Sequence, residues 1–333
     1  MSRSKLSDFV LDEATEHVYI REVYGKTLVE LGSEYPDLVV LDADLTVSTK
    51  TNLFGKEFPH RFFSMGVSEQ DMMGTAAGFA LYGKIPFAST FAVFATGRAW
   101  EHVRQSIAFP KLNVKIVSTH AGVTVGEDGA THQALEDMAL MRVLPNMTVI
   151  VPADSVETEK VIRTIIEEKG PTYVRLARPK FPTIFKKSYK FEIGKARVLR
   201  EGKHVGIFAV GIMVYESLQA AKILEKEGIS ASVVNVSSVK PIDVQTIVEI
   251  ARLTGVVVTA EEHNVIGGLG GAVAEVLGEN CPTPMKRIGM KDRFGTSGDG
   301  MKLLEYFGLK AKNIVQAVHE LLEFNSNRKS VGL

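Results

Sequence analysis

The stretch GVSEQDMMGTAAGFALYGKIPFASTF, residues 66–91, holds in succession a helix start, a helix of small residues and a buried strand. Ser68 followed by Asp71 three positions later is typical of a capping box at a helix N-terminus. Glu69 falls in the first turn, where an acid commonly complements the helix dipole. Small residues such as Gly74 and Gly78 allow another helix to approach closely, and we expect that helix across a subunit interface.

Short β-branched runs and longer amphipathic stretches alternate in the same way along the rest of the chain. Alternation of this kind is typical of βαβ units, and continuous apolar strands indicate sheets buried on both faces. We therefore expect an α/β fold of two domains, each a mainly parallel sheet flanked by helices. The predicted strands are residues 38–42, 86–91, 114–119, 148–151, 172–176, 205–210, 231–236 and 256–260, and the predicted helices are 22–31, 70–81, 98–108, 133–141, 155–168, 213–227, 244–253 and 269–277.

The domain organisation follows from length and from one break in the pattern. A chain of 333 residues fits two domains at about 150 residues each. Residues 178–192 carry two prolines and five Lys/Arg without periodicity, which indicates a domain connector. We predict an N-terminal extension over 1–20, packed as a surface helix, a first domain over 21–185, a linker over 186–192 and a second domain over 193–333.

The charge balance and the cysteine content narrow the class of protein. Lys+Arg and Asp+Glu both number 39, so the net charge is zero, which disfavours nucleic-acid and membrane-surface partners. The one cysteine, Cys281, excludes an internal disulfide and a cysteine-rich metal site. The sequence shows neither a leader segment nor a long apolar run, so we expect a soluble, cytoplasmic protein.

A second stretch, THAGVTVGEDGATHQ (residues 119–133), gathers ionisable groups on a glycine-rich loop. It follows a predicted strand, and ligand sites of open α/β sheets lie at the carboxyl ends of strands. His120, Glu127, Asp128 and His132 can together bind a polyol and move protons near neutral pH. The alternative interpretation is structural, with His132 capping a helix and Asp128 serving a turn.

An aromatic pair and several arginines follow other strand ends. Phe91 and Phe94 are three residues apart and share a face if the chain turns helical, either as core packing or as a platform for a flat heterocycle. The arginines are anion-binding candidates or surface ion-pair partners. They are Arg21, Arg98, Arg104, Arg175 and Arg178.

Gly298-Asp299-Gly300, followed by Asn325 and Asn327, imitates a diphosphate–metal signature. No predicted strand runs into Gly298, and the asparagines fall in a polar tail beyond the last predicted helix. We interpret this stretch as a loop with a chance spacing.

Residues 66–154 as a whole resemble the pyrimidine-binding domain of the transketolase family, and the pairing of VSEQ (67–70) with GEDGATHQ (126–133) is the specific part of the match. The stretches 208–229, 233–243 and 259–277 resemble the transketolase C-terminal domain, so the resemblance spans about residues 19–322. It resembles split transketolases, in which this half is a separate C-terminal-section subunit.

The resemblance implies thiamine diphosphate chemistry. Glu69 matches the glutamate that hydrogen-bonds N1′ of the aminopyrimidine in a proton relay, and we expect its carboxyl to be buried. Phe91 and Phe94 match the aromatic pocket around that ring, and Asp44 matches an aspartate near the cofactor. Gly97 stands where some transketolases carry a further aromatic residue, which implies thinner stacking here.

The resemblance also implies a phosphorylated sugar as substrate. His120, which we group with Glu69 as catalytic, and Asp128 match groups that bind donor sugar hydroxyls. The residues that match groups near the sugar phosphate are His132, Arg178, Arg21 and Ser48. His263 follows a strand in the second domain and is expected to be structural, since that domain has no recognised catalytic residue in the family.

In the family, a preceding domain holds the diphosphate and its Mg²⁺. Only about 20 residues precede Arg21 here, so we expect no metal ligands on this chain and half of an active site. The resemblance implies a separate N-terminal-section subunit as partner, in an α₂β₂ heterotetramer.

Three other functions are compatible with parts of the pattern. A half of 1-deoxyxylulose-5-phosphate synthase would share Glu69 and the glycine loop, although that enzyme is usually one chain. The beta subunit of a 2-oxoacid dehydrogenase decarboxylase component has the same domain plan but typically lacks a loop like GEDGATHQ. A non-enzymatic regulatory protein would not be expected to keep the whole polar constellation.

Overall fold

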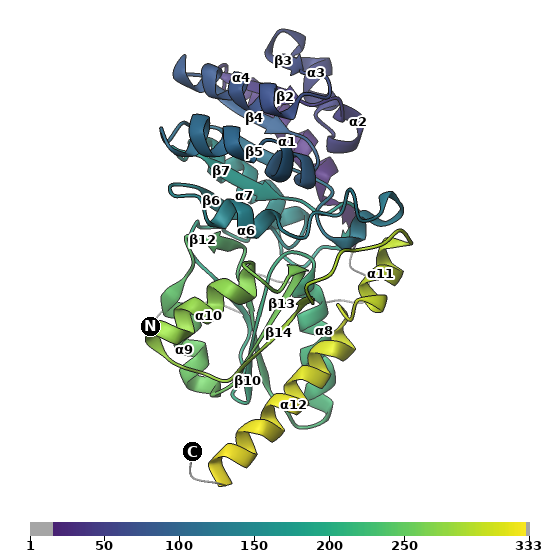
Figure 1. The fold of residues 1–333 in the computed structure, drawn as a ribbon, viewed down its shortest axis with the longest axis vertical. Coiled ribbons are helices and arrows are strands. Elements are labelled where there is room, and N and C mark those ends of the chain that lie inside the picture. The colour runs from purple at the N-terminus through teal and green to yellow at the C-terminus, as the bar shows by residue number, and fades with distance from the viewer. Residues whose placement is uncertain (1–15, 331–333) are drawn as a thin grey trace.

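The computed structural model describes residues 16–330, and its two halves stack end to end along the long axis (Figure 1). Each half is built on its own sheet, and the pairs of neighbouring strands in both sheets are parallel except at one edge of each. The predicted α/β fold with two mainly parallel sheets is therefore confirmed.

The first sheet has the strand order β12-β6-β7-β5-β4-β2-β3, with only the β12–β6 pair antiparallel. Every residue of β2 and β5 is buried, including the polar Asp42, Lys115 and Ser118 at their ends, and burial on both faces explains the apolar residues between. β12 comes from the C-terminal half of the sequence and so ties the two halves together. The strands are β2 (Leu38–Asp42), β3 (Phe62–Ser64), β4 (Ile85–Ser89), β5 (Lys115–Ser118), β6 (Thr148–Ile150), β7 (Thr172–Arg175) and β12 (Ser238–Lys240).

Helices cover both faces of this sheet. Leu28 of α1 and Ile162 of α7 lie in one apolar cluster, whereas Met72 of α4 and Val103 of η4 lie in another. The predicted helix over 98–108 is present as a short α-helix between two wider, π-helical turns. The elements are α1 (Ile20–Glu34), α2 (Thr46–Thr49), α3 (Asn52–Glu57), η2 (Pro59–Arg61), α4 (Glu69–Leu81), η3 (Phe94–Arg98), α5 (Trp100–His102), η4 (Val103–Ala108), η5 (Val123–Asp128), α6 (Asp137–Arg142) and α7 (Ser155–Glu167).

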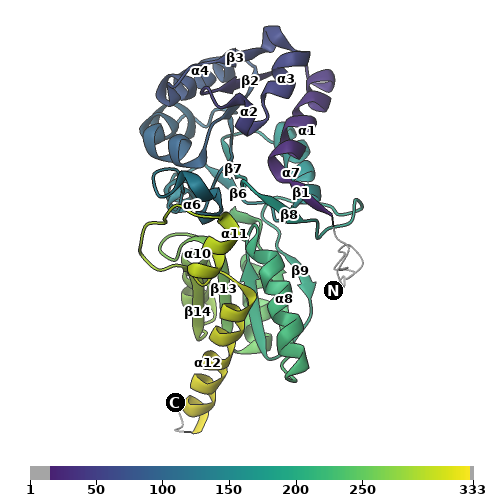
Figure 2. The same cartoon turned by 90° about the vertical axis from the view of Figure 1, so that its right-hand side faces the viewer.

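The second sheet has the order β14-β13-β10-β11-β9, with β9 antiparallel to β11. α8 and α12 pack together on one side of it and α9 and α10 on the other, as Figure 2 shows for α8 and α12. The strands are β9 (Arg197–Arg200), β10 (Val205–Ala209), β11 (Ala231–Asn235), β13 (Val257–Asn264) and β14 (Met285–Met290). The helices are α8 (Met213–Lys226), α9 (Val244–Thr254), α10 (Leu269–Asn280), α11 (Gly300–Tyr306) and α12 (Ala311–Ser330).

The segment 178–192 is packed rather than loose. Its β8 (Lys180–Pro182) pairs antiparallel with β1 (His17–Tyr19), and Phe185 and Tyr189 are buried and stacked, with ring centres 3.9 Å apart. The backbone N–H of Phe185 donates to Asp154 Oδ2 over 2.7 Å. The predicted surface helix over 1–20 is wrong for the described residues 17–19, which form β1, and residues 1–15 lie outside the described part. The domain boundaries themselves stay a prediction.

Two further expectations need correction. The helix predicted from residue 133 begins at Asp137, because Gln133 is buried and its amide donates to the Val123 carbonyl over 3.1 Å instead of entering a helix. Asn325 and Asn327 lie within α12, not in a tail, because a long helix on the surface turns polar residues to solvent. Gly298 and Asp299 lie in a loop, as predicted, and Asp299 caps α11, which begins at Gly300.

Candidate active site

Glu69 begins α4 at the carboxyl-end side of the first sheet and is 3% exposed. Ser68 is the residue before the helix, but its side chain makes no capping hydrogen bond, so the predicted capping box is wrong. Its backbone lies at φ −145° and ψ 67°, which starts the helix without that bond. The predicted burial of the Glu69 carboxyl is present in the structure.

Arg98 holds the Glu69 carboxylate. Its Nη1 lies 2.9 Å from Glu69 Oε1, and its guanidinium carbon lies 4.5 Å from the centre of the Phe94 ring. Glu69 and Arg98 border a hollow of about 450 Å³ that is also lined by Val67, Ser68, Gln70 and Asp71. The buried carboxylate thus lies beside an open space and is linked through Arg98 to the face of Phe94.

The two phenylalanines connect this carboxylate to the glycine loop. Phe91 and Phe94 stack with ring centres 5.9 Å apart and planes 11° apart. Both rings also contact histidines, since Phe91 stacks on His120 with ring centres 3.8 Å apart and Phe94 forms a T-shaped pair with His132 at 5.3 Å. The expected shared face therefore exists, and it lies next to the predicted sugar-binding side chains.

His120 follows β5 in a left-handed conformation with φ +57°. It is buried, and its Nδ1 lies 2.8 Å from Thr119 Oγ1. Burial, together with the nearby positive charges of Arg21 and Arg178, lowers the pKa of His120 to about 3. The imidazole is therefore neutral at ordinary pH and can donate or accept a hydrogen bond without carrying a charge.

Arg178 reaches the glycine loop from the start of the connector. Its Nη1 donates to the Val125 carbonyl and pairs with Glu127, and this hydrogen bond lowers the pKa of Glu127. Asp128 ends η5 and is exposed to solvent. His132 Nδ1 lies 2.9 Å from Thr131 Oγ1. The loop thus presents polar groups outward beside a guanidinium.

Arg21 and Ser48 also meet, through the backbone. Arg21 Nη1 donates to the Ser48 carbonyl over 2.8 Å, and the pKa of Arg21 is lowered by burial. Asp44 follows β2 with φ +62° and is exposed. Arg21 is close enough to His120 to lower its pKa, whereas Ser48 and Asp44 come from the turn after β2.

That turn is organised by Asp42, which the sequence reasoning missed. The buried Asp42 carboxylate accepts from the Leu45 N–H over 2.7 Å and from the Thr49 and Thr51 hydroxyls over 2.7 and 2.8 Å. Burial raises its pKa. An aspartate at a buried strand end followed by two nearby threonines is a local signal that could have identified it.

His263 lies in β13, fully buried at the junction of the halves. Its Nε2 lies 3.9 Å from Asp137 Oδ1 and its Nδ1 lies 3.8 Å from Glu261 Oε2. Burial lowers the pKa of His263 to about 4, so it is a neutral interior group.

Within residues 16–330, no group of three or more His, Cys, Asp or Glu side chains could hold a metal ion. In the same range, none of the helices is both long and apolar enough to cross a membrane. The absence of metal ligands expected for this chain stays a prediction about the assembled enzyme.

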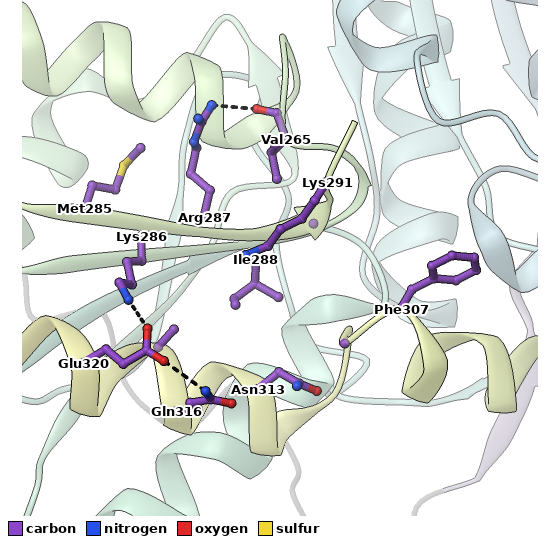
Figure 3. A pocket seen from close by; sticks show the side chains of 13 residues that line it. Val265, Met285, Lys286, Arg287, Ile288, Lys291, Phe307, Asn313, Gln316 and Glu320 are labelled. Atoms are coloured by element: carbon purple, nitrogen blue, oxygen red, sulfur yellow. Dashed lines mark hydrogen bonds and ion pairs between the residues drawn. The ribbon is translucent and has the colours of Figure 1, made fainter. Parts of the chain in front are cut away.

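A second hollow, of about 460 Å³, lies in the C-terminal half between β14 and α12 (Figure 3). Lys286 pairs with Glu320 there, and Glu320 Oε1 accepts from Gln316 over 2.9 Å. None of the predicted site residues lines this hollow, so it is separate from the candidate site.

Two family models match the chain, one described as transketolase, pyrimidine binding domain, over residues 16–183, and one as transketolase, C-terminal domain, over residues 194–314. This chain belongs to the transketolase family. Thiamine diphosphate is the cofactor that membership of the transketolase family implies.

Relatives of this transketolase chain include separate subunits of similar length. It is 53% identical over 304 residues to a Methanocaldococcus jannaschii protein provisionally named transketolase C-terminal section, covering 90% of this chain and 95% of the relative. It is 44% identical over 308 residues to the 6-deoxy-6-sulfo-D-fructose transketolase subunit SqwH of a Clostridium species, covering 92% and 96%. A solved split-gene transketolase, described as an inactive beta4 tetramer, superposes with a TM-score of 0.86 at 57% identity over 91% of this chain and 98% of that one. Such relatives imply a partner subunit and a multimer.

Proposed function

We propose that this transketolase chain, together with a separate diphosphate-binding subunit, transfers a two-carbon ketol unit from a ketose phosphate to an aldose phosphate. The observation that carries the proposal is the position of Glu69, a buried carboxylate on an open hollow that Arg98 links to the stacked Phe91–Phe94 pair. A carboxylate, aromatic rings and an open space suit recognition of a flat, nitrogen-bearing ring.

The residues present fit the aminopyrimidine of thiamine diphosphate. Glu69 would accept or donate the proton at N1′, and Phe91 and Phe94 would line the ring, with Asp44 nearby. Bound there, the cofactor supplies a nucleophilic carbon that adds to the carbonyl of the donor sugar. The task of the chain is then to hold the ring, to exclude water from its apolar edge and to manage the proton at the Glu69 carboxyl.

The glycine loop would receive the sugar. His120 is neutral and rests on Phe91, so it can hydrogen-bond a hydroxyl of the donor next to the ring. Asp128 would bind a second hydroxyl. The phosphate would be bound by His132 and by the cations of Arg178 and Arg21, with Ser48 beside Arg21.

The partner subunit would supply the diphosphate and Mg²⁺ site. Among the described residues, a Cβ atom at Gly74 or Gly78 would meet nothing within 4 Å apart from its chain neighbours and the backbone of α4 itself, and Leu81 and Tyr82 are 72% and 90% exposed. This uncovered face of α4 supports an α₂β₂ assembly through the small-residue helix. The description of the solved relative, which contains beta chains alone, as inactive supports the need for a partner.

The related proteins are named for different sugars, so they do not identify the donor sugar of this chain. One relative is named for 6-deoxy-6-sulfo-D-fructose, and another, 35% identical, for apulose 4-phosphate. A 1-deoxy-D-xylulose-5-phosphate synthase is also related, at 36% identity over 49% of its length. We favour phosphorylated ketoses because the positive charges of Arg21 and Arg178 lie close enough to His120 to lower its pKa and can receive an anionic group of the donor.

The test is reconstitution with an N-terminal-section transketolase subunit in the presence of thiamine diphosphate and Mg²⁺. We expect ketol transfer from xylulose 5-phosphate to ribose 5-phosphate by the pair and none by this chain alone. The sulfosugar, apulose 4-phosphate and pyruvate serve as competing donors. Turnover by the lone chain would overturn the partner requirement, and preference for pyruvate would favour the synthase or dehydrogenase alternatives.

A further inference from the structure

Glu262 reaches from the second sheet to the glycine loop of the first half. It lies on β13 and is buried, and its Oε1 accepts the Thr124 N–H over 2.6 Å. Its carboxyl also lies against Gly122, where an added Cβ would be 2.2 Å from the carboxyl carbon. Gly122 has φ +83°, so this close approach and this backbone both require glycine.

The rest of the loop is held from the same side. Arg175 Nη2 donates to the Glu262 carbonyl over 2.8 Å and to the Ala134 carbonyl over 3.2 Å. The Asn264 N–H donates to the Leu135 carbonyl over 2.9 Å. These bonds fix the residues that follow His132 to β13.

A third contact comes from α11, which packs against η5, and from the segment just before α11. Gln133 Nε2 donates to the Thr296 carbonyl over 2.9 Å. A Cβ at Gly300 would lie 2.8 Å from the Thr124 carbonyl oxygen, so that glycine allows the close packing. The second half therefore encloses the loop from two of its segments.

We propose that Glu262 is a positioning residue for ketol transfer, fixing the loop backbone so that His120, Asp128 and His132 keep the geometry that binds the donor sugar. This inference rests on the proposed function and deepens it, because it assigns the C-terminal domain a part in substrate binding. Glu262 itself touches neither cofactor nor sugar; it acts through Thr124 and Gly122.

The neighbouring Glu261 is a natural control. It is equally buried on the same strand, but it points to the other side, where it accepts the Leu269 and Gly270 N–H groups at the start of α10 over 2.7 and 2.8 Å. Loss of either carboxyl leaves backbone donors unsatisfied and lowers stability. Only loss of Glu262 releases the glycine loop.

The hydrogen bond from the Thr124 N–H to Glu262 does not require a negative charge on the Glu262 side chain. Burial raises the pKa of Glu262 to about 7, which shows that the site disfavours the carboxylate, and a glutamine oxygen can accept the same N–H. Glu262→Gln should therefore preserve loop geometry, whereas Glu262→Ala should not.

The experiment compares Glu262→Gln, Glu262→Ala and Glu261→Ala with wild type in the reconstituted enzyme. For Glu262→Ala we expect KM for the ketose phosphate to rise about tenfold or more, with the thiamine diphosphate dissociation constant unchanged. For Glu262→Gln and Glu261→Ala we expect KM to remain near wild type, although Glu261→Ala also lowers the melting temperature.

Amide hydrogen exchange on this chain alone gives a second readout that needs no activity. Faster exchange at residues 122–126 in Glu262→Ala, but at the start of α10 in Glu261→Ala, supports the assignment. Equal effects of the two alanine variants on KM and on loop exchange would overturn it. If the wild-type pair transfers no ketol unit, the proposed function fails instead, and the exchange experiment still decides whether Glu262 positions the loop.

Discussion

Arg98 Nη1 lies 2.9 Å from Glu69 Oε1, so the carboxylate at the centre of the candidate site is paired with a cation of its own chain. The same guanidinium lies over the Phe94 ring at 4.5 Å. A guanidinium is flat, donates hydrogen bonds and stacks on aromatic faces. In the proposed function the aminopyrimidine needs the same two partners, so Arg98 competes with the cofactor ring.

Replacing Arg98 by methionine should therefore tighten thiamine diphosphate binding. An ion pair with one half-exposed partner and a cation–π contact are together worth about 1 kcal/mol, so we expect about a fivefold lower dissociation constant, measured by calorimetry on the reconstituted enzyme. Arg252→Met, on the exposed surface of α9, is the matched control. Weaker binding by Arg98→Met would show that Arg98 supports the ring instead.

Glu69→Ala should abolish most of the ketol transfer. A positioned acid or base contributes about 10²–10⁴-fold, and we expect a kcat loss of that order with the protein still folded, because Arg98 is 53% exposed and can be solvated without its partner. Glu101→Ala, which removes an exposed acid of α5, is the control. Undiminished transfer by Glu69→Ala would refute the proton relay.

The low pKa of His120 has a consequence for pH profiles. Since the pKa of His120 is about 3 in the folded chain, its titration should not change kcat/KM for the donor between about pH 5.5 and 8.5. His120→Gln should lower kcat/KM by about tenfold or more without changing the shape of the profile. A limb near neutral pH that disappears in His120→Gln would show that the working imidazole is charged.

The lowered pKa of His120 also makes the folded protein less stable at acid pH. The unfolded chain takes up a proton on this imidazole near pH 6.5, whereas the folded chain does so near pH 3. Between these two pH values the unfolded state binds more protons than the folded state. The free energy of unfolding therefore decreases as the pH drops from about 6.5 towards 3. Denaturant titrations at several pH values should show that the free energy of unfolding decreases less at acid pH in His120→Gln than in wild type.

Much of the fold could be predicted because buried parallel strands leave a strong local signal. The predicted strand over 38–42 has the same bounds as the observed β2, because every residue of this strand is buried. β12 and β3 are three residues long and gain their strand character only from neighbours in the sheet, so local patterning did not show them. No predicted helix covers α12 (Ala311–Ser330), because its many polar residues, which a surface helix turns to solvent, weaken the apolar pattern.

The sequence predicts the site residues that follow the ends of strands. It does not predict the contacts between site residues that are far apart in the sequence. The Glu69–Arg98 contact joins residues 29 apart, and the Thr124–Glu262 contact joins residues 138 apart. Nothing in the local sequence of either partner signals these contacts, because the chain topology creates them. Asp42 is the exception, since its threonine partners are only seven and nine residues away.

Asp154 tests whether the connector is part of the folded core. Its carboxylate accepts the Glu157 N–H as the cap of α7, and it also accepts the N–H groups of Ile184 and Phe185. Asp154→Ala leaves these buried donors unsatisfied, so we expect a loss of about 3 kcal/mol or more in the free energy of unfolding, measured by urea denaturation. Asp299→Ala, which removes the exposed cap of α11, should cost about 1 kcal/mol. Equal losses would mean that the connector contacts contribute little.

Arg178 tests the discrimination between phosphorylated and free sugars. Its guanidinium is bound to the Val125 carbonyl and Glu127, so it is held in place at the loop before substrate arrives. Removing a charge-assisted bond worth about 1.5–3 kcal/mol should raise KM for a ketose phosphate about 10–100-fold in Arg178→Met and leave the unphosphorylated ketose nearly unaffected. Lys180→Met, which removes an exposed cation two residues away, is the control. An equal loss with both sugars would mean that Arg178 acts through Val125, by holding the loop, and not through the phosphate.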